Sequence, residues 1–216
     1  MDGRQTDAKD ILAILVSFAS VSEVSNLDIA YYIEDYVKAL GADCLRFPST
    51  EGDKTNLLAR FGPLLEGGVV LSGHMDVVPV EGQAWSSDPF RLIEREGRLY
   101  GRGSTDMKGF LAACMAASHL AATRNLRRPL YLAFSYDEEV GCMGVAPMVD
   151  YIVHQLPAID CVIVGEPTQM RLVVAHKGAN DWRTVITGKE AHSSMPHAGA
   201  HAIFAGANLI SFLETV

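Results

Sequence analysis

Three short runs of apolar residues constrain the fold more than any other feature of this sequence. They cover residues 68–72, 130–135 and 161–164, and none of them contains a charged side chain. Continuous apolar runs of this length are typical of strands that are buried on both faces of a sheet. Because helix-length segments separate strands along the chain, we expect an α/β domain with a central sheet.

The segments around these runs show the periodicity expected of helices on a sheet. Residues 8–20 and 28–40 have apolar positions at helical spacing, and the Ala-rich segment 108–122 has the same period. We therefore predict three helices, the first two of them amphipathic and packed on the sheet. Residues 56–61 predict a further strand, and residues 79–98, rich in Gly, Pro, Ser and charged side chains, predict a long loop.

The pattern changes near residue 179. Residues 182–188 alternate between polar and apolar side chains, which predicts a half-exposed strand, and residues 199–215 predict one helix. A single strand and a single helix cannot bury a core of their own. We therefore interpret residues 1–178 as the N-terminal part of one domain and residues 179–216 as the beginning of a second.

Composition excludes several classes of protein. The chain has 216 residues, is 49% hydrophobic and carries a formal net charge of −8, which is an ordinary globular profile. The acidic balance argues against a nucleic-acid partner, because no basic surface is available to displace counterions from phosphates. No apolar stretch approaches the roughly 20 residues needed to cross a bilayer, and the polar N-terminus lacks the layout of a secretory signal.

The cysteines point to a reducing compartment. They are dispersed and form no C-x-x-C pair: Cys44, Cys114, Cys142 and Cys161. We expect them to be reduced and buried in a soluble, cytoplasmic protein.

Metal-type ligands follow each of the three apolar runs. They are His74 and Asp76, then Glu138 and Glu139, then Glu166, and Asp106 stands just ahead of the Ala-rich helix. Ligand sites in open α/β sheets collect at the carboxyl ends of the strands, so we expect these side chains to converge. A mixed imidazole and carboxylate set suits Zn²⁺, with Mn²⁺ or Co²⁺ as alternatives. Two metals that share a bridging carboxylate can activate a water and polarise a carbonyl.

The spacing within two of these clusters suggests separate roles. His74 and Asp76 lie on the same side of a strand, so Asp76 can accept a hydrogen bond from the imidazole and fix its tautomer. Adjacent Glu138 and Glu139 cannot easily point to the same place. We therefore expect one of them to bind a metal and the other to take the proton of the attacking water.

Each cluster alone also has a simpler interpretation. Asp106 can cap a helix, the Glu138–Glu139 pair can lie in a solvated loop, and Glu166 can be a turn residue before Pro167. Because all of these would have to coincide at one sheet edge, we favour the metal site. The glycines in 101–109 do not form G-x-G-x-x-G directly after a strand, which argues against a nucleotide site.

The motifs, taken in order, resemble a known family. It is the di-zinc metallopeptidase family that holds acetylornithine deacetylase, succinyl-diaminopimelate desuccinylase, aminoacylase and carboxypeptidase G. The resemblance covers residues from about 56 to 205, and DMKGF, GEPT and AHKG are most similar to the acetylornithine deacetylase branch. The motifs are SGHMDVVPV, WSSDPF, LYGRGSTDMKG, DEEVGCMG, VGEPT and AHKG.

The resemblance implies a role for each matching residue. His74 and Glu166 would hold one zinc, Asp106 would bridge, and Glu139 would hold the second zinc. Glu138 would be the general base and acid, and Asp76 would orient His74. His192 resembles a lid histidine that reaches across a homodimer to polarise the substrate carbonyl, although it can also be a polar turn histidine.

The family also implies a three-layer catalytic domain with a mixed sheet, interrupted by an α+β lid. Residues 1–178 then correspond to the N-terminal part of the catalytic domain, and residues 179–216 to the first strand and helix of the lid. In the family the chain returns after the lid and supplies the last histidine of the second zinc site. This sequence ends at Val216, so we expect an incomplete sheet and a second site without that histidine. His201 stands where relatives usually have Asn.

Two classes of function follow. The first is a metal-dependent amide hydrolase that removes the acetyl group from N-acetylornithine in arginine biosynthesis, with a related desuccinylase or dipeptidase as the alternative. Its partner is a small N-acyl amino acid, and we expect no nucleic-acid or membrane partner. The second is a catalytically inactive remnant that still binds metal. The resemblance implies a homodimer for full-length members of the family, which dimerise through the lid. We do not expect one from this chain, which holds only the first strand and helix of the lid.

Overall fold

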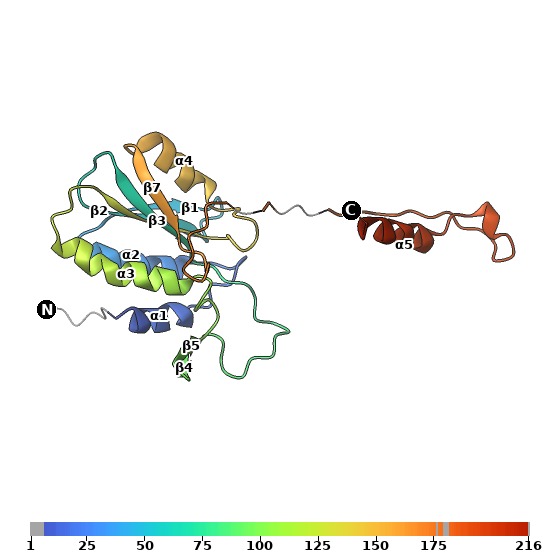
Figure 1. Cartoon of the computed structure of the whole chain (residues 1–216), viewed down its shortest axis with the longest axis horizontal. Helices are drawn as coiled ribbons and strands as arrows, with labels where there is room; N and C mark the ends of the chain where they lie inside the picture. The colour runs from blue at the N-terminus through green and yellow to red at the C-terminus, as the bar shows by residue number, and fades with distance from the viewer. Residues whose placement is uncertain (1–6, 176, 179–181, 216) are drawn as a thin grey trace. The chain divides into compact units, whose positions relative to one another are not determined.

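The computed structural model describes residues 7–175, 177–178 and 182–215 (Figure 1). The chain forms two compact units, Met1–Arg171 and Leu172–Val216, and each is described by itself. The expected domain boundary after residue 178 stays a prediction. His176 of the AHKG motif lies outside the described residues.

A five-stranded sheet organises the first unit. Its strands in spatial order are β1 (Asp43–Pro48), β2 (Thr55–Phe61), β6 (Leu130–Ser135), β3 (Gly68–His74) and β7 (Ile159–Val164). β3 runs parallel to both β6 and β7, whereas β1 pairs with β2, and β2 with β6, in antiparallel fashion. The expected α/β fold with a mixed sheet is confirmed, and the three apolar runs form its three parallel strands.

Helices cover both faces of this sheet (Figure 1). α2 (Leu27–Lys38) and α3 (Lys108–Thr123) pack on one face, and α4 (Ala146–Gln155) lies on the other. α1 (Ala8–Ser17) begins after Asp7, whose side chain accepts a hydrogen bond from the Lys9 amide at 2.8 Å. We expected α1 to pack on the sheet, but it packs mainly on α3, because α2 and α3 already cover that face.

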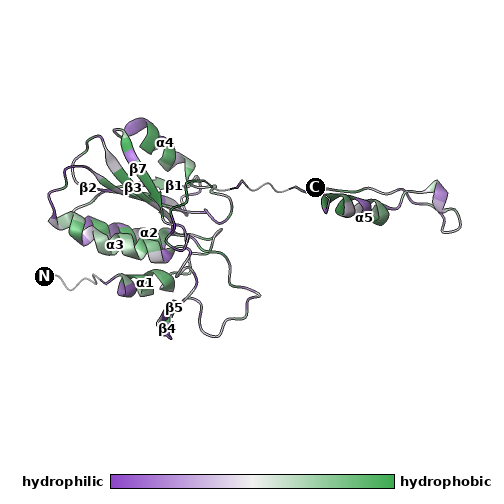
Figure 2. Cartoon of the chain, in the orientation of Figure 1, coloured by the Kyte–Doolittle hydropathy of each residue, from purple (hydrophilic) through white to green (hydrophobic). Residues whose placement is uncertain are grey.

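The two faces of β6 bury alternate side chains in two separate cores. Leu132 and Phe134 face the main core with α3, where Leu111 is fully buried. Tyr131 and Ala133 belong to a smaller core on the α4 side of the sheet. This alternation is the period of two that a strand imposes on its side chains. Figure 2 shows hydrophobic residues along these strands and along the helices that pack on them.

Several local expectations were wrong or incomplete. The predicted loop 79–98 includes β4 (Ile93–Arg95) and leads into β5 (Arg98–Tyr100), which form a separate hairpin. All four cysteines are free as expected, but only Cys114 is buried; Cys44 is half-buried, and Cys142 and Cys161 are exposed. Among the described residues, no helix combines the length and apolar character needed to cross a membrane.

The second unit contains a short 3₁₀ turn, η1 (Pro196–Ala198), and the helix α5 (Ala202–Leu213). The predicted helix is therefore found, within 199–215. The predicted strand at 182–188 is wrong: these residues adopt no strand, and Trp182 and Val185 are exposed. An alternating segment becomes a strand only where a neighbouring strand takes its hydrogen bonds, and the pairing described in this unit is one bridge between Lys189 and Ala200.

Candidate metal centre

The predicted ligands converge at one edge of the sheet. His74 is the last residue of β3 and pairs with Ser135 at the end of the parallel strand β6. Glu138 and Glu139 follow β6 in a loop, and Glu166 follows β7, where the Gly165 amide still donates to Ser72 O at 3.1 Å. Because parallel strands end at the same edge, their carboxyl ends bring these side chains together.

His74 lies at the centre of the cluster. Its side chain is buried, and Nε2 lies 3.1 Å from Asp106 Oδ1, 3.8 Å from Glu138 Oε2 and 3.7 Å from Glu166 Oε1. Two sets of ligand atoms lie within 4.8 Å of one another: those of His74, Asp106 and Glu139, and those of His74, Glu138 and Glu166. One imidazole nitrogen surrounded by carboxylate oxygens is a donor set that suits a divalent cation, so the residues fit a metal.

The pairing of the two glutamates differs from the sets implied by family resemblance. Glu139 groups with Asp106 and His74, as expected for one metal, while Glu138 groups with Glu166 and His74. The two adjacent glutamates thus belong to different ligand groups that share the imidazole of His74. The roles of base and ligand for Glu138 and Glu139 stay predictions.

Asp76 contacts both the imidazole of His74 and the loop that carries Glu138 and Glu139. His74 Nδ1 donates to the backbone carbonyl of Asp76 at 2.9 Å and lies 3.5 Å from Asp76 Oδ1. Since a carbonyl can only accept, Nδ1 carries the proton in the neutral ring and Nε2 presents its lone pair to the carboxylates. The Asp76 carboxylate also accepts hydrogen bonds from the amides of Glu138 and Glu139, at 3.1 and 3.2 Å.

The electrostatics of the cluster reflect crowded negative charge. Burial first, and then the charge of Asp106, raises the pKa of both Glu139 and Glu166. Burial lowers the pKa of His74, but hydrogen bonding and the charge of Asp76 outweigh it and raise that pKa to about 9. The carboxylates around the imidazole repel one another, and a bound cation would relieve this repulsion.

A buried lysine lies two residues after Asp106, and the sequence did not reveal its burial. Lys108 is fully buried at the start of α3, and its Nζ donates to Phe18 O at 2.7 Å. Burial lowers the pKa of Lys108 to about 7. The partner carbonyl is distant along the chain, so no local pattern indicated this contact.

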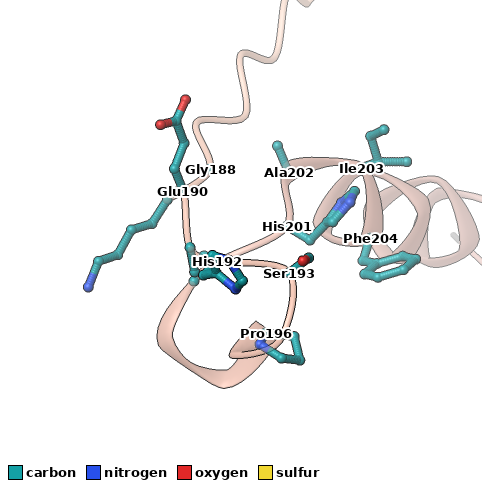
Figure 3. Close-up of a pocket in the computed structure, with 13 residues that line it drawn as sticks. Gly188, Glu190, His192, Ser193, Pro196, His201, Ala202, Ile203 and Phe204 are labelled. Atoms are coloured by element: carbon teal, nitrogen blue, oxygen red, sulfur yellow. The ribbon is translucent and has the colours of Figure 1, made fainter.

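His192 lies in the second unit, in a loop beside α5. It lines a hollow of about 940 Å³ together with Ser193, Pro196 and His201 (Figure 3). Its Nδ1 accepts a hydrogen bond from the Ser194 amide at 3.2 Å and lies 2.8 Å from the Ser194 hydroxyl. The ring of His201 packs against the ring of Phe204, with 4.4 Å between the two ring centroids. The expected role of His192 stays a prediction.

Comparison with known proteins identifies the family. The sequence model of peptidase family M20/M25/M40 matches residues 70–209, which include all four predicted metal ligands. The chain belongs to this family. The expected resemblance is therefore confirmed.

Individual M20 relatives agree with this assignment. The chain is 41% identical to an acetylornithine deacetylase of Pasteurella multocida over 182 residues, which cover 83% of this chain and 46% of that protein. Human carnosine dipeptidase 1 is 26% identical with a TM-score of 0.62, over 73% of this chain and 37% of that one. An M20 family metallo-carboxypeptidase from Sulfolobus solfataricus is 25% identical with a TM-score of 0.63, over 76% of this chain and 37% of that one. The chain thus spans about half the length of the curated relative or less.

Proposed function

We propose that this chain forms the metal-binding part of an amide hydrolase that removes the acetyl group from N-acetylornithine, as a step of arginine biosynthesis. The observation that carries the proposal is the convergence of His74, Asp106, Glu139 and Glu166 at the carboxyl edge of the sheet. The 41% identity to an acetylornithine deacetylase supports this substrate over other N-acyl amino acids.

The metal proposal is a pair of zinc ions, with cobalt or manganese as alternatives. His74 and Glu166 would hold one ion, Glu139 the other, and Asp106 both. Bound divalent cations supply Lewis-acid polarisation of the amide carbonyl and lower the pKa of a water molecule. Mixed imidazole and carboxylate sets accept several divalent metals, so the donor set alone does not select one of them.

In the proposed reaction the protein residues move one proton and hold the geometry. Glu138 takes a proton from the attacking water and returns it to the amine nitrogen as the carbon–nitrogen bond breaks. Asp76 keeps His74 in the tautomer with a free Nε2. In a homodimer, the partner's His192 would donate a hydrogen bond to the developing oxyanion, as the family resemblance implies.

A dipeptidase is the second candidate, because human carnosine dipeptidase 1 shares the fold at 26% identity. Both activities use the same centre and differ in what lies on either side of the amide. An inactive, metal-binding remnant is the third possibility. A cytoplasmic location and the oligomeric state stay predictions.

Hydrolysis assays test these proposals directly. The 216-residue chain is loaded with Zn²⁺ or Co²⁺ and given N-acetylornithine, an N-succinyl amino acid or a dipeptide, and the released amine is measured. We expect release from N-acetylornithine, an about 10²–10⁴-fold lower rate in Glu138→Gln, and no change in the exposed control Glu51→Gln. A preference for the dipeptide would replace the substrate assignment. No hydrolysis by the folded, metal-loaded chain would favour the remnant.

A further inference from the structure

The loop that carries Glu138 and Glu139 is held at both ends by one side chain from the start of β2. We call residues 136–144 the acidic loop. Asn56 is fully buried; its Oδ1 accepts a hydrogen bond from the Tyr136 amide at 3.2 Å, and its Nδ2 donates to Gly144 O at 2.8 Å. A single amide group therefore joins the first and last residues of the loop. Gly144 suits this closure, because a Cβ there would lie 2.2 Å from the Tyr136 ring.

Lys54, two residues before Asn56, holds the same loop through Asp137. Its Nζ donates to both carboxylate oxygens of Asp137, at 2.8 and 2.7 Å, and only 9% and 15% of the two side chains are exposed. Asp137 has a φ of 55°, a left-handed conformation that Asp tolerates better than most residues. The ion pair therefore fixes an unusual backbone position directly before Glu138.

The opposite side of the acidic loop is anchored on Asp76. This carboxylate accepts hydrogen bonds from the amides of Glu138 and Glu139, directly after the residue that Lys54 holds. The loop also closes on itself, since the amides of Gly141 and Cys142 donate to Glu138 O at 2.9 and 3.0 Å. Loss of either anchor would free the backbone from which both carboxylates extend.

We propose that Lys54 and Asn56 are positioning residues of the metal centre. They act through the acidic loop by setting where the carboxylates of Glu138 and Glu139 lie relative to His74. The inference rests on the proposed function only for the chemistry that the loop serves. Whether residues at the start of β2 hold the acidic loop in place can be measured without metal or substrate.

The test uses the full chain with both charges of the ion pair removed. Lys54→Met with Asp137→Asn avoids leaving one buried charge without a partner, and Asn tolerates the left-handed backbone. Amide hydrogen exchange by NMR is measured on the metal-free chain, and the dissociation constant for Co²⁺ is measured separately. We expect exchange of the Glu138 and Glu139 amides to become about tenfold faster or more, and Co²⁺ binding to weaken about tenfold.

A more exposed ion pair at the other end of β2 serves as the control. Arg60 pairs with Asp43 across the β1–β2 ladder, so Arg60→Met with Asp43→Asn removes the same charges away from the loop. We expect exchange at Glu138 and Glu139 and Co²⁺ affinity to stay as in the unchanged chain. Lys54→Arg, which keeps the positive charge, should preserve most of the protection of both amides.

The outcomes separate this inference from the proposed function. Unchanged exchange of both amides in a folded Lys54→Met/Asp137→Asn variant would overturn the positioning role. If that variant does not fold, Lys54→Gln with Asp137→Asn replaces it, since it also leaves no unpaired charge, and unchanged exchange there would overturn the role equally. If the unchanged chain binds no Co²⁺, the proposed function fails, while amide exchange still decides whether Lys54 positions the loop.

Discussion

The Ser22 hydroxyl donates a hydrogen bond to Asp76 Oδ2 at 2.7 Å, although the two residues belong to distant parts of the chain. Both residues are buried. Burial raises the pKa of Asp76, but hydrogen bonds from His74 and from Ser22 outweigh burial and lower that pKa. Asp76 in turn holds His74 and the acidic loop. Ser22 therefore fixes the orientation of the carboxylate on which the centre depends.

Removing this hydroxyl should destabilise the fold. We expect Ser22→Ala to lower the free energy of unfolding by about 1.5–3 kcal/mol, because a buried hydrogen bond to a charged acceptor is lost. Urea unfolding measures the change. Ser17→Ala is the control, since Ser17 bonds to Ile14 O within α1, and it should change stability by less than about 0.5 kcal/mol. Equal effects of the two variants would contradict the role of Ser22.

Glu138 and Glu139 should differ in what their loss removes. We expect Glu139→Gln to weaken Zn²⁺ binding at least about tenfold, because a ligand oxygen loses its charge. Glu138→Gln should keep the affinity near that of the unchanged chain and lose turnover instead. Competition with a chromophoric chelator measures both affinities. Because Glu138 groups with His74 and Glu166 in the structure, an equal loss of affinity in both variants would make Glu138 a ligand.

A methyl group at Gly165 should disturb the end of β7, next to Glu166. A Cβ there would lie 2.0 Å from the ring of Phe110, so the ring or the strand end must move. We expect Gly165→Ala to lower the free energy of unfolding by about 1–3 kcal/mol through overpacking. Thermal unfolding measures it.

Two variants show whether Phe110 is the cause. Phe110→Ala combined with Gly165→Ala should recover part of the loss, because the two positions share the same space. Gly178→Ala should be close to neutral, since a Cβ at Gly178 meets nothing within 4 Å. If the combined variant is as unstable as the sum of its single changes, the clash is not what limits this site.

The cysteines should label in an order set by burial. Cys114 is 4% exposed, and burial raises its pKa to about 12, so almost no thiolate forms at pH 8. We expect iodoacetamide to modify exposed Cys161 first and to reach Cys114 only after unfolding, as followed by mass spectrometry. Modification of Cys114 at the rate of Cys161 in the folded chain would mean that the core under α3 is open.

The sequence predicted the sheet and the candidate site where its patterns were local. The runs that became β3, β6 and β7 were apolar throughout, and His74, Glu138 and Glu166 were found because each follows one of them. β1 was missed because its residues are mostly exposed at the sheet edge and carry no clear apolar pattern. The strand expected at 182–188 was wrong because alternation alone does not supply a hydrogen-bonding neighbour.

The support of the site could not be predicted from the sequence for a related reason. Ser22, Lys54 and Asn56 bond to residues that lie far along the chain, and nothing in their local sequence indicates those partners. Their importance follows from burial, because each polar group must find a partner once it leaves water. Such pairs become visible only when the fold is known.

Metal stoichiometry tests the central claim most directly. The chain is equilibrated with Zn²⁺ and dialysed, and the bound metal per folded chain is counted by mass spectrometry, in parallel with the variant His74→Ala. We predict one or two tightly bound ions in the unchanged chain, and fewer in the variant, because His74 belongs to both candidate ligand groups. A folded chain that retains no zinc would contradict the account, since His74, Asp106, Glu139 and Glu166 would then converge without forming a metal site.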